Sequence, residues 1–187
     1  MSLIPLLWNR LVEAVTVPFA PLQLLIVLGL LGLYGLLALP LAWGSGLLRR
    51  PWRQLTMRRW LQLGASLVWM PALLEEGVFR VLLLPRALLD LAPLAQATWA
   101  ALSVGLFVLY HPLSGRLWYP PGRRLFEQAR FLLPCSLLGA ACVLAYVSTG
   151  AHWAPVLIHW ITVLIWLGPG DGAKDLTDRR SAQRTAH

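Results

Sequence analysis

Long stretches without a charged side chain constrain this chain more than any other feature of its sequence. No Asp, Glu, Lys or Arg occurs within residues 14–48, 91–115 or 131–170. A helix needs about 20 consecutive apolar residues to cross the hydrocarbon core of a bilayer, and the last stretch is long enough for two crossings. Charged residues make up only 13% of the chain, against roughly a quarter in soluble domains. The sequence therefore predicts an all-α fold, a polytopic transmembrane helical bundle, and excludes a soluble single-core protein.

The apolar pattern predicts about five spans and two flanking segments. The expected spans are residues 22–43, 60–84, 94–111, 131–147 and 152–167, with an interruption of the second at Pro71 and a connection over 112–130. Residues 1–18 mix apolar side chains with Asn9, Arg10 and Glu13, which is typical of an amphipathic helix at the membrane interface. We expect residues 19–168 to form one transmembrane domain and residues 169–187 to be a polar, disordered tail.

The basic excess lies between the apolar stretches. The chain has 16 Lys and Arg against 8 Asp and Glu, for a net charge of +8. The loops after the first and third expected spans and the tail hold 5, 4 and 4 of these 16 residues, which marks those segments as cytoplasmic. We expect membrane lipid as a partner and no nucleic acid. The sequence predicts a multi-pass integral membrane protein, in the plasma membrane of a prokaryote or in an organelle membrane, and leaves the oligomeric state open.

Five ionisable side chains fall within or near the expected spans: Glu75, Glu76, Arg80, His111 and His159. An isolated charge at the bilayer centre costs at least about 2.5 kcal/mol, so such groups face a bundle interior and pair with one another. Glu76 and Arg80 are four residues apart, which favours an ion pair on one helical face and is compatible with a purely structural role. Glu75 is rotated by about 100° from Glu76, so it needs a separate explanation.

The two histidines lie on two other spans. Phe107 precedes His111 by four residues, so an aromatic ring can pack beside the imidazole. At about 1.5 Å of rise per residue, Glu75 and His159 come out near mid-membrane, and His111 lies several ångströms nearer the cytoplasmic side. Three spans that each contribute a carboxylate or an imidazole predict a polar site inside the bundle.

Three motifs in this order resemble the CPBP family of intramembrane proteases (CaaX prenyl protease and bacteriocin-processing, or Abi), which is related to the Ras-converting CaaX endopeptidases. The first is Glu75 and Glu76 followed, after three intervening residues, by Arg80, which Phe79 precedes; the second is Phe107 with His111. The third is the turn Ser148, Thr149 and Gly150, followed by Trp153, Ala154, Pro155 and His159. The resemblance covers about residues 60–165.

The resemblance implies an endopeptidase of glutamic type without a cofactor, acting on a membrane-associated peptide or protein. Glu75 and His111 would activate water and His159 would stabilise the oxyanion, with Glu76, Arg80 and Phe107 in supporting roles. The family has Asn or Asp four residues after its last histidine, where this chain has Val163. Losing one oxyanion donor costs other hydrolases about 10² to 10³ in rate, so we expect a slow enzyme.

Two alternatives use the same residues. One carboxylate and two imidazoles also form the ligand set of a catalytic zinc ion, so Glu75, His111 and His159 are alternative zinc ligands, although the sequence has no HExxH helix. In the other alternative the protein is a non-catalytic membrane scaffold whose buried charges hold helices together, which Val163 favours.

Overall fold

The computed structural model of this protein is all-helical over the residues that it describes. These are residues 3–18, 20–48, 52, 54–85, 88–170, 172, 174 and 176, and no strand occurs among them. Most of the expected disordered tail, residues 169–187, lies outside the described residues, and so do Arg49, Arg50 and Arg53 of the expected basic loop.

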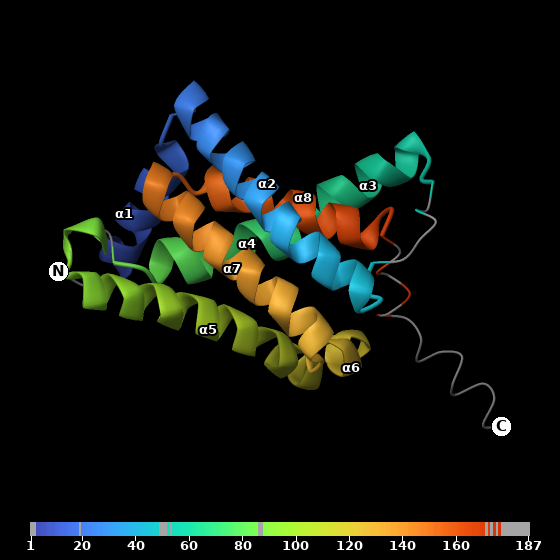
Figure 1. Ribbon diagram of the computed structural model, residues 1–187. Helices are drawn as coiled ribbons and strands as arrows, with labels where there is room; N and C mark the ends of the chain where they lie inside the picture. The colour runs from blue at the N-terminus through green and yellow to red at the C-terminus, as the bar shows by residue number, and fades with distance from the viewer. Residues whose placement is uncertain are drawn as a thin grey trace.

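Three long helices form the frame of the bundle: α2 (Pro21–Gly44), α5 (Pro93–Leu117) and α7 (Ala129–Thr149). In the described part of the chain, these three are long and apolar enough to cross a membrane. Proline occupies the first turn of α2 and α5, where its missing N–H has no partner to lose. The α7 helix lies between α2 and α5 and packs against both (Figure 1). The first, third and fourth expected spans are therefore confirmed as helices.

Small side chains bring α8 (Trp153–Leu167) close to α2 and α7. One buried cluster consists of Val27, Leu138, Ala141, Cys142, Ala145, Ala151, Ala154 and Ile158. Alanines at helix interfaces let backbones approach closely, which strengthens packing where lipid offers no hydrophobic driving force. The α8 helix has 15 residues, or roughly 22 Å at 1.5 Å per residue, short of the roughly 30 Å of a hydrocarbon core.

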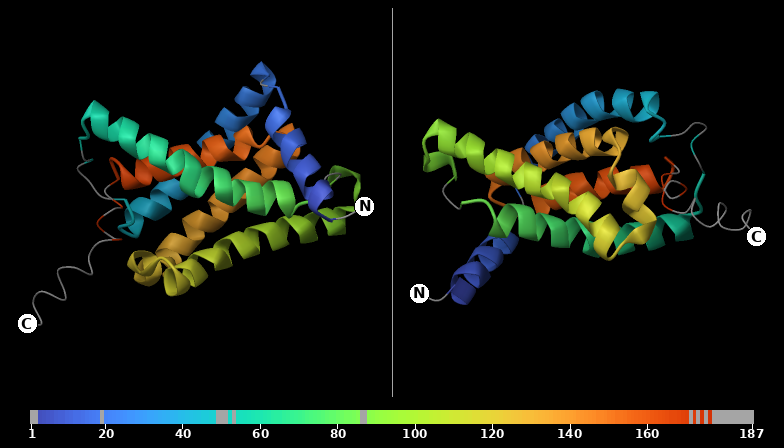
Figure 2. Two further views of the ribbon diagram at one scale, coloured as in Figure 1. Left: turned by 180° about the vertical axis from the view of Figure 1, so that it is seen from behind. Right: turned by 90° about the horizontal axis from the view of Figure 1, so that it is seen from below.

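The second expected span is a broken rod. It consists of α3 (Met57–Leu67), η1 (Val68–Leu73), α4 (Leu74–Glu76) and η2 (Gly77–Leu82), and η1 and η2 are π-helical. The break falls at Met70, which has extended backbone angles because Pro71 disfavours the helical conformation of the residue before it. The interruption expected at Pro71 is confirmed, whereas the π-helical turns were not expected. Figure 2 shows the rod crossing the back of the bundle. Because this rod is broken and α8 is short, the count of five spans stays a prediction.

The third expected span is longer than the sequence suggested. The connection expected to start at Pro112 starts later, because α5 continues to Leu117 with Pro112 inside it. Ser114 and Gly115 beyond the proline are buried, and a Cβ on Gly115 would lie 2.8 Å from the Arg123 backbone. The short helices η4 (Pro120–Gly122) and α6 (Arg123–Phe126) thus pack on the last turn of α5 and stabilise it. His111 consequently lies well inside the helix.

The N-terminal helix α1 (Leu3–Thr16) lies at the end of the bundle opposite α3 (Figures 1 and 2). Its Arg10 donates hydrogen bonds to the carbonyl oxygens of Leu82 (3.0 Å), the last residue of η2, and of Leu84, two residues beyond it. A cation is favourable at that position because the last carbonyls of a helix carry partial negative charge. The expected helix within residues 1–18 is therefore present, and its arginine stabilises the neighbouring segment; a short 3₁₀ turn, η3 (Leu88–Asp90), follows that segment.

Candidate active site

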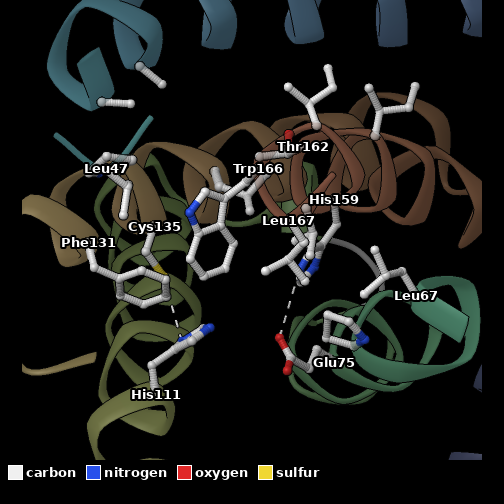
Figure 3. A pocket seen from close by; sticks show the side chains of 18 of the residues that line it. Leu47, Leu67, Glu75, His111, Phe131, Cys135, His159, Thr162, Trp166 and Leu167 are labelled. Carbon is white, nitrogen blue, oxygen red and sulfur yellow. Dashed lines mark hydrogen bonds and ion pairs between the residues drawn. The ribbon is translucent and has the colours of Figure 1, made fainter. Parts of the chain in front are cut away.

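An apolar cavity of about 470 Å³ lies where α2, α4, α5, α7 and α8 meet. Its walls are mostly leucine and aromatic side chains, and Glu75, His111 and His159 all line it. Figure 3 shows His111 and Cys135 facing Glu75 and His159 across this space. The structure thus brings the three site residues expected from the sequence to the wall of one cavity.

A buried ionic network lies behind this wall. Glu76 Oε2 is 3.1 Å from Arg80 Nε, as the spacing of four residues predicts, and Glu76 Oε1 is 2.7 Å from His159 Nδ1. Glu76 and Arg80 are completely buried, and His159 is 2% exposed. Burying an ion far from water is costly unless an opposite charge and hydrogen bonds compensate it, and here each carboxylate oxygen of Glu76 has a cationic or N–H partner. We call Glu76, Arg80 and His159 the ionic network.

The neighbouring carboxylate is placed differently. Glu75 Oε2 lies 3.9 Å from His159 Nε2, too far for a hydrogen bond, and it has no hydrogen-bond partner among the described residues. Glu75 is 8% exposed and lines the cavity. Glu75, which the spacing of the charged residues left without an explanation, therefore faces the cavity with an acceptor oxygen available.

His111 approaches from the other side of the cavity. Its Nδ1 is 2.9 Å from the Phe107 carbonyl oxygen, which can only accept, so Nδ1 carries the proton and Nε2 of the neutral ring has a free lone pair. The Phe107 ring packs edge-on against both imidazoles, with ring centroids 5.0 Å from His111 and 5.7 Å from His159. Phe107 is also 4.8 Å from the Arg80 guanidinium carbon, within the range of a cation–π contact. Phe107 therefore contacts both histidines and the ionic network.

His159 is oriented in the same way by its carboxylate partner. Because the Glu76 carboxylate accepts, the Nδ1–H of His159 donates, and Nε2 turns toward Glu75. Both imidazoles therefore present Nε2 as the atom that is free for a reacting group.

The carboxylates, imidazoles and thiols of the site are the side chains that could bind a metal ion. Within the described ranges, no three His, Cys, Asp and Glu side chains come close enough together to hold a metal ion. The alternative zinc ligands Glu75, His111 and His159 line the same cavity but do not form such a cluster.

Val163 also lines the cavity and presents an alkyl side chain there. The neighbouring Thr162 does not replace the missing amide, because its hydroxyl donates to the Ile158 carbonyl in its own helix (2.8 Å). Val163 therefore places an alkyl group at a position of the cavity wall where the family resemblance implies an amide or a carboxylate.

Sequence reasoning missed His152. Its Nε2 is 3.2 Å from the Leu73 carbonyl oxygen, so it donates across from the start of α8 to the turn that precedes Glu75. Its backbone N–H donates to the Ala14 carbonyl oxygen of α1 (2.9 Å). The seven-residue spacing from His152 to His159 places both on one face of α8 and is the signal that could have revealed it.

The fold and the cavity define a class of protein: a helical membrane protein with a carboxylate and two imidazoles around an apolar internal cavity. A family model described as type II CAAX prenyl endopeptidase, Rce1-like, matches residues 52–165, which include all three motifs. The chain belongs to this family, as the resemblance to CPBP proteases indicated. Neither a curated protein nor a solved structure matches the chain.

The two adjacent glutamates should differ in their effect on folding. We expect Glu76→Gln to lower the free energy of unfolding by about 3–5 kcal/mol, because it leaves the buried Arg80 without its countercharge. Glu75→Gln should unfold like the unmutated protein, since it breaks no hydrogen bond of the described residues. Denaturant titration of both variants in detergent, followed by tryptophan fluorescence, measures the difference. Equal destabilisation of the two variants would contradict this division.

Proposed function

We propose that this protein is an intramembrane endopeptidase that hydrolyses a peptide bond in a membrane-associated protein or peptide. The observation that carries the proposal is the Glu75 carboxylate, buried at the wall of an apolar cavity without a hydrogen-bond partner in the described part of the chain and facing two oriented imidazoles. A purely structural carboxylate would be paired as Glu76 is, with an ion pair to Arg80 and a hydrogen bond to His159, whereas the contact of Glu75 with His159 Nε2 is a looser one of 3.9 Å. Membership of the type II CAAX prenyl endopeptidase family supports the same reaction class.

In the proposed mechanism, Glu75 and His111 bind one water molecule between them. Nε2 of His111 accepts a hydrogen bond from this water, and Glu75 takes the proton as the water oxygen attacks the scissile carbonyl carbon. The tetrahedral intermediate collapses when the C–N bond breaks and Glu75 returns the proton to the departing amine. The products are a carboxylic acid and an amine, and the glutamate is regenerated.

His159 stabilises the oxyanion in this mechanism. Its Nδ1–H is held by Glu76, which leaves Nε2–H of the imidazolium to donate to the developing negative charge. Donors held in place before the reaction are effective because they need no reorganisation in the transition state. The ionic network thus contributes to catalysis by orienting His159.

Removing the two water-activating groups should abolish cleavage. We expect Glu75→Gln and His111→Ala each to lower kcat by about 10² to 10⁴, the usual contribution of a general acid–base group. The assay uses internally quenched peptides in proteoliposomes, one with a prenylated cysteine near its C-terminus and one unmodified and apolar. Glu127→Gln, on the surface just after α6, is the matched control, because among the described residues Glu127 forms an ion pair with the exposed Arg116 alone.

The outcomes of this assay separate the two classes of function. Cleavage by the unmutated protein and the control, but not by the two site variants, supports the proposal. Equal cleavage by all four proteins would remove Glu75 and His111 from the chemistry, and no cleavage by the unmutated protein would favour the scaffold.

Val163→Asn should give a faster enzyme. The amide would add an N–H donor at a cavity position where the chain has an alkyl group, and one such donor is worth about 10²-fold or more in kcat of other hydrolases. Val163→Leu, whose side chain has the same number of heavy atoms and the same branch point as asparagine but no donor, is the control. A rate increase in both variants, or in neither, would show that the missing amide does not limit the reaction.

We also propose that the reaction needs no metal ion. Cleavage should persist after incubation with a strong chelator, because the described carboxylates, imidazoles and thiols form no three-ligand cluster. The measurement compares the chelated protein before and after addition of zinc. Loss of cleavage with the chelator and its return with zinc would assign Glu75, His111 and His159 to the metal instead.

A further inference from the structure

Ser103, in the middle of α5, lies completely buried against the ionic network. Its Oγ accepts a hydrogen bond from Arg80 Nη1 (3.1 Å) and donates one to the Phe79 carbonyl oxygen (2.8 Å). A serine hydroxyl has one proton, so the direction of both hydrogen bonds is determined: the guanidinium donates to the hydroxyl, and the hydroxyl donates to the carbonyl.

The π-helical segment explains why this hydroxyl is needed. The Leu83 N–H donates to the Val78 carbonyl five residues back (3.2 Å), and the Leu84 N–H donates to the Arg80 carbonyl four residues back (3.3 Å). Between these two hydrogen bonds the spacing changes from five residues to four. Neither N–H therefore binds the carbonyl of Phe79, the residue between the two acceptors. Buried carbonyls need a donor, and Ser103 supplies it from a neighbouring helix.

We propose that Ser103 is a positioning residue of the active site, acting on His159 through Arg80 and Glu76. This inference rests on the proposed function for its effect on catalysis. Ser103 anchors one end of the guanidinium through Nη1, and Glu76 binds the same guanidinium at Nε. Glu76 in turn holds Nδ1 of His159. A change at Ser103 therefore reaches the catalytic imidazole through three consecutive polar contacts without touching the cavity.

An aromatic ring also connects the two ends of this series of contacts. Ser103 and Phe107 are neighbours on one face of α5, and Phe107 packs against Arg80 and His159. One helix face thus holds the guanidinium by two contacts, a hydrogen bond to the serine and a cation–π contact with the ring. Phe79, whose carbonyl Ser103 binds, packs edge-on against Phe107 with centroids 5.5 Å apart.

The first test measures the imidazole directly and does not depend on catalysis. Protein with ¹⁵N-labelled histidine rings is compared in detergent by NMR, and the Nδ1–H signal of His159 is assigned by its loss in His159→Gln. A proton in a short hydrogen bond to a carboxylate resonates far downfield. We expect Ser103→Ala to shift or broaden this signal and Ser103→Thr, which keeps the hydroxyl, to retain it. An unchanged signal in Ser103→Ala would overturn the inference.

The second test measures the effect on cleavage. Ser103→Ala should lower kcat on the order of tenfold with little change in KM, because it leaves buried polar groups unsatisfied behind the site but does not alter the cavity wall. Ser103→Thr should restore most of the rate. Ser136→Ala is the matched control, since Ser136 is a half-buried serine whose hydroxyl, in the part of the chain that the structure describes, binds just the Leu132 carbonyl of its own helix. A rise in KM at unchanged kcat would contradict a positioning role.

The two tests keep this inference separate from the proposed function. If the unmutated protein cleaves no peptide, the endopeptidase proposal fails, while the NMR signal still decides whether Ser103 positions His159. If Ser103→Ala does not fold, Ser103→Cys takes its place in both measurements, because a thiol of similar shape is a weaker donor and acceptor. The same shift of the His159 signal is then expected, and its absence would again overturn the inference.

Discussion

The structure depends on one buried set of charges, the ionic network of Glu76, Arg80 and His159. Each of these groups would be costly inside an apolar bundle by itself, and each becomes tolerable only when its partners come within hydrogen-bonding distance. The network joins α4 and η2 to α8, and through Ser103 also to α5. The contacts that pack these helices together therefore also compensate the buried charges, and they form the side of the site behind the cavity wall.

The ionic network does not use the second carboxylate, Glu75, which is therefore available for the proposed chemistry. Glu76 has an ion pair with Arg80 and a hydrogen bond with His159, whereas Glu75 turns toward the cavity without a hydrogen bond from any described residue. The two glutamates lie in α4, a short α-helical segment between two π-helical segments. Single π-helical turns often occur at functional sites. Pro71 ends the preceding α-helical register, so this segment can take an orientation that a continuous helix from α3 would not allow.

Much of the fold could be predicted because a membrane restricts the choices. Charge-free stretches long enough for a crossing predicted α2, α5 and α7, since only helices satisfy their own backbone hydrogen bonds in lipid. Pro112 was expected to end α5, but the packing of Arg123 on Gly115 holds the helix beyond it. The roles of Glu75, His111 and His159 in catalysis remain predictions, since the geometry describes where they lie and not what they do.

The sequence by itself determined the local pairs, because residues four apart on a helix meet wherever that helix packs: Glu76 with Arg80, and Phe107 with His111. Only the tertiary structure decided that His159 binds Glu76 rather than Glu75, and that a serine on α5 completes the contacts of Arg80. These contacts join residues far apart in the chain. They depend on how each helix is rotated and how deep it lies in the bundle. The π-helical turns and the close packing of alanines determine both, and residue spacing along the sequence does not encode them.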